Sequence, residues 1–172
     1  MEKVRKQAVR KADPAMPARG GVLAYIGLGA NLGEDPRAAV VSAINAIAAL
    51  DRVQLTRQSS LYGSAPVDAG GNDYVNSVVE VQTALEPHAL LAHLQAIENA
   101  AGRARPYRNA PRTLDLDILL FDDLVLHDET LVIPHPRMAQ RAFVLRPLAE
   151  IAPALVNAAQ LQAVADQSVW VL

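Results

Sequence analysis

The chain has 172 residues, of which 51% are hydrophobic and 20% are charged, a balance typical of one globular domain with a substantial core. Its formal net charge of −2 argues against a nucleic-acid binder, and the absence of cysteine excludes disulfides, thiolate zinc sites and a cysteine nucleophile. No apolar run approaches the roughly 18 residues that span a bilayer, and the basic first 20 residues lack the apolar stretch of a secretory signal. We therefore expect a cytoplasmic protein without nucleic-acid or membrane partners, with a solvated basic tail at residues 1–21 and a single domain at 22–172. A monomer is also expected, although the composition does not reveal the oligomeric state.

The first half of the chain alternates between strand and helix signals. Residues 22–29 are apolar and bounded by glycine, which predicts a short buried strand. Pro36 suits the first position of a helix, and the apolar residues after it recur at helical spacing. Further strands are predicted at residues 53–62 and 74–83, with a loop of turn-forming residues at 64–73 between them.

A second helix is predicted to open at Glu86-Pro87 and to end at Gly102, followed by a loop and a fourth strand at residues 113–121. The order strand, helix, strand, strand, helix, strand is typical of a ferredoxin-like split βαβ core. This is an α/β (α+β) fold with a mainly antiparallel sheet and helices packed on it.

The remaining residues are interpreted as an added C-terminal layer. They contain a predicted short strand near Leu131, a helix start at His135-Pro136 and an apolar stretch at residues 143–151.

Asp115 and Asp117 are the most informative residues, because positions i and i+2 of a strand share a face. Their Cα atoms would lie about 6.6 Å apart, with Leu116 turned into the core on the opposite face. Two adjacent carboxylates repel each other unless a cation lies between them. Mg²⁺ prefers oxygen ligands and completes its octahedron with water and substrate phosphates, so the pair predicts a site for one or two magnesium ions.

The same tripeptide has other interpretations. An Asp-x-Asp strand is most often the solvated face of an antiparallel sheet. A carboxylate pair also serves glycoside hydrolysis, but aromatic residues make up only 4% of this chain and no sugar-stacking cluster is visible. The sequence around the pair therefore has to separate these interpretations.

A basic loop precedes the two aspartates. Residues 102–112 contain Arg103, Arg105, Arg108 and Arg112 and no acidic residue. Arginine makes bidentate contacts with phosphate oxygens and stays charged at any working pH. Taken alone, such a loop could equally be a phosphate-binding loop or a solvated surface loop. Next to two carboxylates it favours metal–phosphate chemistry, which needs positioning, metal ions and cationic stabilisation.

Gly27, Gly29 and Gly33 lie between the first strand and the first helix, where nucleotide-binding loops are found. No Gly-Lys-Ser/Thr follows them, and Leu32 stands where a dinucleotide-binding fingerprint has its third glycine. We therefore expect these glycines to serve a tight turn and close backbone packing.

Residues 108–119, RNAPRTLDLDIL, resemble the signature of the 6-hydroxymethyl-7,8-dihydropterin pyrophosphokinases of folate biosynthesis. The resemblance extends from about Val22 to Pro153 and includes further motifs in the family's order. These are Ala24-Tyr25-Ile26, Gly29-Ala30-Asn31-Leu32, Ser59-Ser60-Leu61-Tyr62, Asp73-Tyr74-Val75-Asn76, Pro134-His135-Pro136 and Arg141-Ala142-Phe143.

The resemblance implies a ferredoxin-like α/β fold and pyrophosphoryl transfer from ATP to a hydroxymethyl dihydropterin, with AMP as product. It implies that Asp115 and Asp117 bind two Mg²⁺ ions and act in catalysis with Arg103 and Arg112. The implied ATP-binding residues are Gln95, Arg103, Arg105, Arg112, His135 and Arg141. The implied pterin-binding residues are Ser64, Val67, Tyr74, Asn76 and Phe143.

The chain departs from the family pattern in the loop before the aspartates. Asn109 and Ala110 stand where the family often has an aromatic residue and a glycine, so the loop residue that covers the substrates is left open. Two other functions also stay open. One is a ferredoxin-like ligand-binding or regulatory module without activity, and the other is a nucleotide transferase that releases pyrophosphate instead of AMP.

Overall fold

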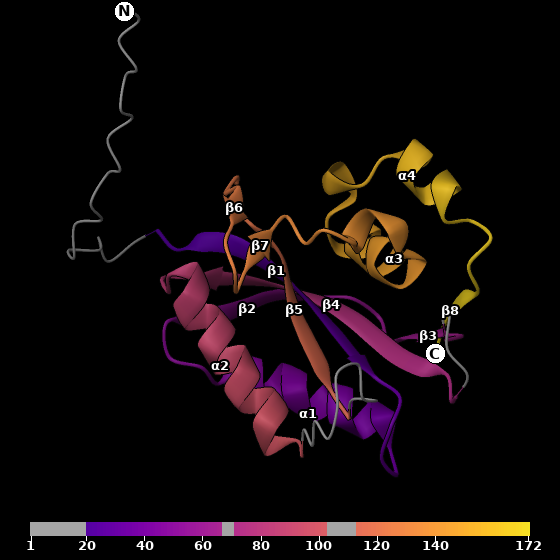
Figure 1. Cartoon of the computed structure of the whole chain (residues 1–172), viewed down its shortest axis with the longest axis horizontal. Coiled ribbons are helices and arrows are strands. Elements are labelled where there is room, and N and C mark those ends of the chain that lie inside the picture. The colour runs from indigo at the N-terminus through magenta and orange to yellow at the C-terminus, as the bar shows by residue number, and fades with distance from the viewer. Residues whose placement is uncertain (1–19, 67–70, 103–112) are drawn as a thin grey trace, which may run out of the picture.

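The computed structural model of the chain describes residues 20–66, 71–102 and 113–172. Within them an antiparallel sheet runs through the middle of the molecule, with helices on both of its faces (Figure 1). The division into a tail at residues 1–21 and a domain at 22–172 stays a prediction, because nearly all of the tail lies outside the described residues.

The main sheet consists of strands from both ends of the described chain. It contains β1 (Val22–Ala30), β2 (Val53–Gln58), β3 (Tyr62–Ser64), β4 (Tyr74–Thr83), β5 (Asp115–Phe121) and β8 (Val169–Val171). The strand order is β5-β1-β4-β3-β8, with β2 also paired to β4, and every pair is antiparallel. Outside this sheet, β6 (Leu126–His127) and β7 (Val132–Ile133) form a two-stranded ribbon, which confirms a short strand near Leu131.

The strand predicted at residues 53–62 is divided into two, β2 and β3, by a break at residues 59–61. Ser59, which is buried, maintains the contact with β4 across this break. Its backbone N–H donates to the carbonyl of Val78 (2.9 Å), and its hydroxyl accepts from the Val78 N–H (3.0 Å). The prediction of one continuous strand was wrong because a serine side chain replaces part of the backbone ladder.

Two helices, α1 (Pro36–Ala48) and α2 (Pro87–Ala100), cover one face of the sheet (Figure 1). Proline occupies the first turn of each, as predicted, and the Asp35 carboxylate accepts from the Ala38 N–H at 2.9 Å to cap α1. Gly102 follows α2 with φ of +85°, a conformation that favours glycine after a helix. The core between these helices and the sheet includes Ala24, Ile26, Leu28, Val40, Ile44, Ile47, Val79, Val81, Leu90, Leu94, Leu116 and Ile118.

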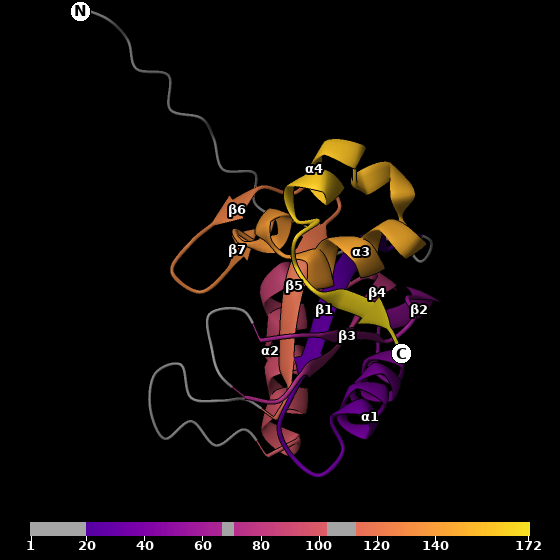
Figure 2. The ribbon, with the colours of Figure 1, turned by 90° about the vertical axis from the view of Figure 1, so that its right-hand side faces the viewer.

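The opposite face of the sheet is covered by α3 (Ala142–Ile151) and α4 (Ala158–Ala163), which lie on the other side in Figure 1. A second buried cluster fills this layer and includes Tyr25, Tyr62, Val78, Leu119, Val144, Leu145 and Leu148. These elements are the added C-terminal layer, and the whole arrangement confirms the predicted mixed α/β architecture. Figure 2 shows β8 beside β3, at the end of that layer.

The helix start predicted at His135-Pro136 is wrong, because α3 begins at Ala142. The backbone N–H of His135 donates instead to the carbonyl of Leu119 in β5 (2.9 Å). A 3₁₀ turn at Met138–Gln140 then leads into the helix. Neither α4 nor β8 is predicted by the sequence patterns. None of the described helices is both long and apolar enough to cross a bilayer.

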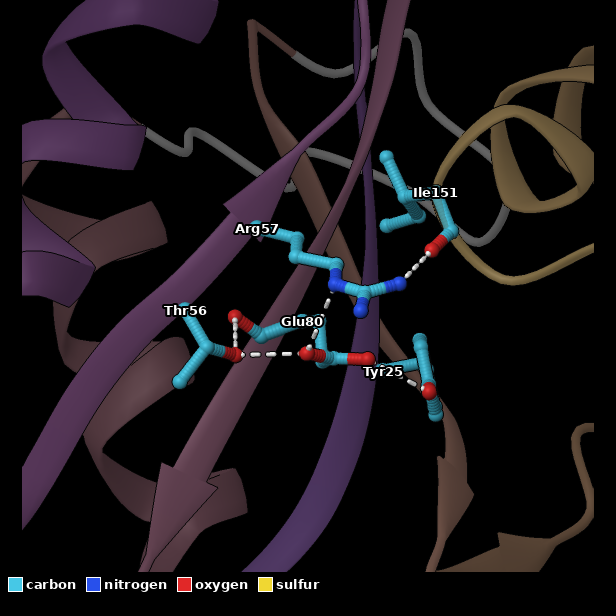
Figure 3. A network of polar contacts seen from close by, with 5 residues as sticks. All are labelled: Tyr25, Thr56, Arg57, Glu80 and Ile151. Atoms are coloured by element: carbon cyan, nitrogen blue, oxygen red, sulfur yellow. Dashed lines mark hydrogen bonds and ion pairs between the residues drawn. The ribbon is translucent and has the colours of Figure 1, made fainter.

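A partly buried polar network joins the sheet to the C-terminal end of α3 (Figure 3). The Glu80 carboxylate of β4 accepts from the hydroxyls of Tyr25 (2.6 Å) and Thr56 (2.7 Å), and the Arg57 guanidinium lies 3.7 Å from it. Arg57 in turn donates to the carbonyl of Ile151, the last residue of α3 (2.6 Å). Burial, followed by the bond to Glu80, raises the pKa of Tyr25 to about 12, so this hydroxyl remains a donor at neutral pH.

Candidate active site

A cavity of about 550 Å³ lies between the sheet and the N-terminal end of α3. Four strands and a helix contribute to it, namely β1, β3, β4, β5 and α3, together with Gln140 of the 3₁₀ turn at Met138–Gln140. Its lining comprises Gly27, Leu28, Gly29, Ser64, Ala65, Tyr74, Asn76, Asp115, Asp117, Arg137, Gln140, Arg141, Phe143 and Val144. Sequence segments up to 117 residues apart, counted from Gly27 to Val144, therefore meet in one place.

Asp115 and Asp117 project from the same face of β5 into this cavity, as predicted. Both are half-buried, whereas Leu116 and Ile118 between and beyond them are buried in the core on the opposite face. The register of β5 against β1 shifts just after the two aspartates, because Ile26 pairs with Ile118 whereas Tyr25 pairs with Leu120. The extra residue is Leu119, a β-bulge that ends the alternation just past the two carboxylates.

The floor of the cavity is a strip of backbone without side chains. Gly29 of β1 pairs with Asn76 on one side and with Asp115 on the other, and Gly27 pairs with Asp117. A Cβ atom on Gly29 would lie 3.3 Å from the Asn76 side-chain oxygen. The prediction of a tight turn is therefore wrong for Gly27 and Gly29, which lie inside β1, whereas the prediction of close packing agrees with the short distances at both positions. The prediction of a tight turn holds for Gly33, whose φ is +90°.

The end of the cavity away from β5 presents a buried amide next to aromatic rings. The side-chain amide of Asn76, which is 2% exposed, donates to the hydroxyl of Ser64 at 2.9 Å. Tyr74 and Phe143 line the same cavity. Four of the five predicted pterin-binding residues thus lie together. The fifth, Val67, lies outside the described residues.

The region beside the aspartates is cationic. Arg141 lines the cavity, with its guanidinium carbon 5.4 Å from the centre of the Phe143 ring, a cation–π distance. Burial lowers the pKa of Arg141, as does neighbouring Arg137, while Asp117 and Asp115 act in the opposite direction. Arginine remains charged under such shifts, so the site offers phosphate oxygens a partly desolvated cation.

His135 lies next to Asp117, with its Nε2 atom 3.8 Å from the Asp117 carboxylate. Burial lowers the pKa of His135, and the charges of Arg141 and Arg137 lower it further, which favours the neutral ring, while Asp115 acts in the opposite direction. The Nδ1 atom accepts from the Arg137 N–H at 3.2 Å. The single ring proton of this tautomer is therefore on Nε2, where it can be donated to a ligand oxygen near Asp117.

Glu98 of α2 reaches the back of β5 between the two aspartates. This buried carboxylate accepts from the backbone N–H of Leu116 at 2.8 Å. Because β5 is an edge strand, that N–H points away from β1 and needs a partner outside the sheet. Glu98 thus holds the segment that carries Asp115 and Asp117.

Not every predicted residue reaches the cavity. Gln95 is exposed on α2 and is not part of the lining, so its contact with a nucleotide stays a prediction. Arg103, Arg105 and Arg112 lie outside the described residues, and their roles stay predictions as well.

Seven lining residues and the supporting residue Glu98 were not among the predicted site residues. The seven are Gly27, Leu28, Gly29, Ala65, Arg137, Gln140 and Val144. Arg137 could have been found from its position two residues after His135. Glu98 follows Leu94 at helical spacing, a pattern that predicts a buried position, but the pattern does not say what its carboxylate binds.

Two other hollows of similar size carry different chemistry. One, of about 460 Å³, lies at the opposite ends of β1, β4 and β5 and includes Glu86 and Asp122. The other, of about 630 Å³, is an alanine-rich groove between α1 and α2. Among the residues that the structure describes, neither hollow contains a predicted site residue, so the chemistry of the lining, and not its volume, identifies the site.

The cavity suits a magnesium ion that arrives with a phosphate ligand. Within the described residues no group of three or more acidic, histidine or cysteine side chains could hold a metal by itself. Asp115 and Asp117 supply two hard oxygen donors on one face, and Mg²⁺ is commonly bound by one or two carboxylates together with water and phosphate oxygens.

Comparison with known proteins gives the same family as the sequence motifs, and the match covers most of the chain. Residues 25–153 match the model of the family described as 7,8-dihydro-6-hydroxymethylpterin-pyrophosphokinase (HPPK). The 2-amino-4-hydroxy-6-hydroxymethyldihydropteridine pyrophosphokinase of Haemophilus influenzae is 46% identical over 136 residues, which cover 78% of this chain and 84% of that protein. The protein of the same name from Bacillus subtilis is 46% identical over 132 residues, which cover 75% and 77%.

The fold is also found in solved structures. The crystal structure of a Plasmodium falciparum HPPK-DHPS triple mutant superposes with a TM-score of 0.62 at 15% identity, over 77% of this chain. The chain spans about 40% of the length of that longer protein, so this likeness concerns the fold alone. The sequence matches carry the stronger conclusion, that this chain belongs to the 7,8-dihydro-6-hydroxymethylpterin-pyrophosphokinase family.

Proposed function

We propose that this chain transfers a pyrophosphoryl group from ATP to 6-hydroxymethyl-7,8-dihydropterin in folate biosynthesis, giving AMP and the pterin diphosphate. Membership of the family and the relatives at 46% identity support this activity. The structural observation that carries it is the single cavity in which Asp115 and Asp117 face a buried amide, Asn76, across a floor of glycine backbone.

The pterin ring is proposed to occupy the end of the cavity at Asn76. A pterin presents hydrogen-bond donors and acceptors along one edge, which a fixed amide can match. The bond from Asn76 to Ser64 fixes the orientation of that amide. Tyr74 and Phe143 offer aromatic faces for stacking, and the predicted contribution of Val67 completes this group.

The triphosphate is proposed to lie at the other end, beside the two aspartates. Asp115 and Asp117 would hold two Mg²⁺ ions, and these ions would neutralise the negative charge of the phosphates. Arg141 would contact the phosphates as a partly desolvated cation. His135 would donate a hydrogen bond from its Nε2–H group to a phosphate oxygen. We further propose nucleotide contacts for Gln95, Arg103, Arg105 and Arg112.

The reaction is an in-line displacement at the β-phosphorus of ATP. The oxygen of the pterin hydroxymethyl group bonds to this phosphorus and releases its proton to solvent, the bond from the phosphorus to the α,β-bridging oxygen breaks, and AMP leaves. Asp115 would lie beside the attacking hydroxyl, while Arg103 and Arg112 would stabilise the transferring group. The residues of this chain need only bind, orient and neutralise, which agrees with a chain that has no cysteine nucleophile.

The decisive test replaces Asp117 with asparagine and measures AMP release from ATP, Mg²⁺ and the pterin. The substitution keeps the shape of the side chain and removes its charge, so we expect kcat/KM to fall by at least about 10²–10³-fold, comparable to the loss of one strong electrostatic contact in a site. Asp123→Asn is a matched control, because Asp123 is exposed and lies at the opposite hollow. Activity of Asp117→Asn within threefold of the wild type would contradict the assignment.

The same assay separates the competing functions. Release of pyrophosphate instead of AMP would indicate a nucleotide transferase, and release of neither product would indicate a binding module without activity. The predicted cytoplasmic location, monomeric state and lack of nucleic-acid partners stay predictions. Light scattering on the purified chain tests the monomer.

A further inference from the structure

The stretch at residues 167–170 contacts both walls of the cavity, although it lies beyond the segment 25–153 that the family model matches. On the β3 side, Ser64 pairs with Val169, and the carbonyl of Ser168 accepts from the Ala65 N–H at 3.3 Å. On the α3 side, the Arg146 guanidinium donates to the carbonyl of Val169 at 3.0 Å. One short segment therefore ties the wall that carries Ser64 to the helix that begins beside Arg141.

The side-chain amide of Gln167 makes the closest contact with the start of α3. Its oxygen accepts from the Ala142 N–H at 2.9 Å, and its nitrogen donates to the carbonyl of Gln140 at 2.8 Å. These two bonds bracket Arg141, and Phe143 follows directly. Both of these residues line the cavity.

This contact satisfies the first N–H group of α3, which has no partner within the helix. The first N–H groups of a helix have no partner within the helix and are usually satisfied by the side chain that precedes it. Arg141, the residue before α3, makes no such bond, and Ala142 is fully buried and so has no access to water. Gln167 supplies the acceptor from 25 residues further along the chain.

The same stretch also forms part of a second, smaller cavity next to the site. This cavity of about 150 Å³ is lined by Gln167, Ser168 and Val169 together with Ser64, Ala65, Pro66 and Phe143. A shift of the stretch would therefore be felt at Ser64 and Phe143, the two sides of the proposed pterin site.

We propose that Gln167 is a positioning residue for substrate binding, whose amide fixes the backbone at residues 140–142 and thereby the directions of Arg141 and Phe143. The identity of the ligand rests on the proposed function. The physical basis is that a site binds more tightly when its groups are held in place before the ligand arrives, because ordering them on binding costs affinity.

Gln167→Ala removes both bonds, and each is worth about a fivefold change in an equilibrium. We expect the KM for the pterin to rise about five- to tenfold, with kcat changed less than twofold, because the loss concerns binding of ground state and transition state alike. Gln167→Glu keeps the acceptor for the Ala142 N–H but loses the donor to Gln140. It should recover part of the loss.

Gln160→Ala is the matched control. Gln160 belongs to the capping box of α4 with Asn157, so its removal destabilises the same layer of the fold without a contact to Gln140 or Ala142. An equal rise of the pterin KM in Gln160→Ala and Gln167→Ala, or an unchanged KM in Gln167→Ala, would overturn the proposal.

A second readout does not depend on the substrate. Amide hydrogen exchange in the ligand-free protein should accelerate at Ala142 in Gln167→Ala and not in Gln160→Ala. Unchanged protection at Ala142 would show that Gln167 does not hold the helix start, even if the chain acts on another substrate. Accelerated exchange without any AMP release by the wild type would instead contradict the proposed function and leave the positioning role supported.

Discussion

Gly63 of β3 lies directly beneath Trp170 of β8, and adding one methyl group there should displace the last strand. A Cβ atom on Gly63 would lie 2.4 Å from Cε2 and 2.5 Å from Nε1 of the indole. The substitution that tests this contact is Gly63→Ala.

The size of the effect follows from these distances. Nonbonded carbon atoms attract best at about 3.5–4.0 Å, so the indole would have to move by about 1 Å or more. Trp170 is 41% exposed and can swing toward solvent, so the cost should be that of ordinary overpacking, about 2 kcal/mol. For a chain of this length that corresponds to a fall in Tm of about 4–8 °C.

Trp170 is the one tryptophan of the chain, so its fluorescence reports on β8 specifically. We expect Gly63→Ala to shift its emission to longer wavelength as the indole becomes more exposed. Thermal unfolding followed by circular dichroism measures the change in Tm.

A double-mutant cycle with Trp170→Ala decides whether the clash is the cause. Gly63→Ala should cost little when the indole is absent. If Gly63→Ala lowers the Tm equally in both backgrounds, or leaves the Tm and the emission of the wild-type background unchanged, the steric reasoning is wrong.

Two further predictions concern the polar contacts beneath α3. Tyr25→Phe removes the buried hydroxyl that donates to Glu80 at 2.6 Å, and it should lower the free energy of unfolding by about 1–3 kcal/mol in urea titrations. No measurable change would contradict the role of this bond. Burial acts to raise the pKa of Glu150, but hydrogen bonds from Tyr62 and Ser60 outweigh it and the net pKa is lowered from 4.5. A carboxyl group whose pKa is lower in the folded than in the unfolded chain stabilises the fold at pH above the unfolded-chain pKa, and this stabilisation is lost as the pH falls. The difference in free energy of unfolding between wild type and Glu150→Gln should therefore be constant from pH 8 to 5.5 and shrink below about pH 4.5. A difference that grows in acid would refute this.

The relation between the aspartate pair and the sheet is the part of the site that local sequence predicts best. A strand turns alternate residues to opposite faces, so Asp115 and Asp117 had to share a face once β5 formed, and buried Leu116 fixed which face. The cavity confirms this placement. The four predicted pterin-site residues among the described ones also meet there, although that grouping came from family resemblance and not from spacing.

Local patterns failed where a side chain or a distant segment took over a backbone contact. Ser59 divides a predicted strand by bonding to Val78, and the bond from His135 to Leu119 replaces a predicted helix start. The elements α4 and β8 are too short for a hydrophobic period to be visible. Their positions depend on partners far away in the sequence, such as Ala142 for Gln167.

The sequence by itself determined the alternation of strands and helices as far as β5, apart from the break at residues 59–61, together with the shared face of the two aspartates and the family. These follow from short-range rules of side-chain direction and from motifs that are contiguous in the chain. Only the tertiary structure decided that Gly27 and Gly29 form an open floor, that burial near Arg137 and Arg141 lowers the pKa of His135, and that residues 167–170 contact both walls of the cavity. The physical reason is that desolvation, electrostatic fields and cross-chain hydrogen bonds depend on which groups lie near one another in space, and that distance is set by packing of the whole chain.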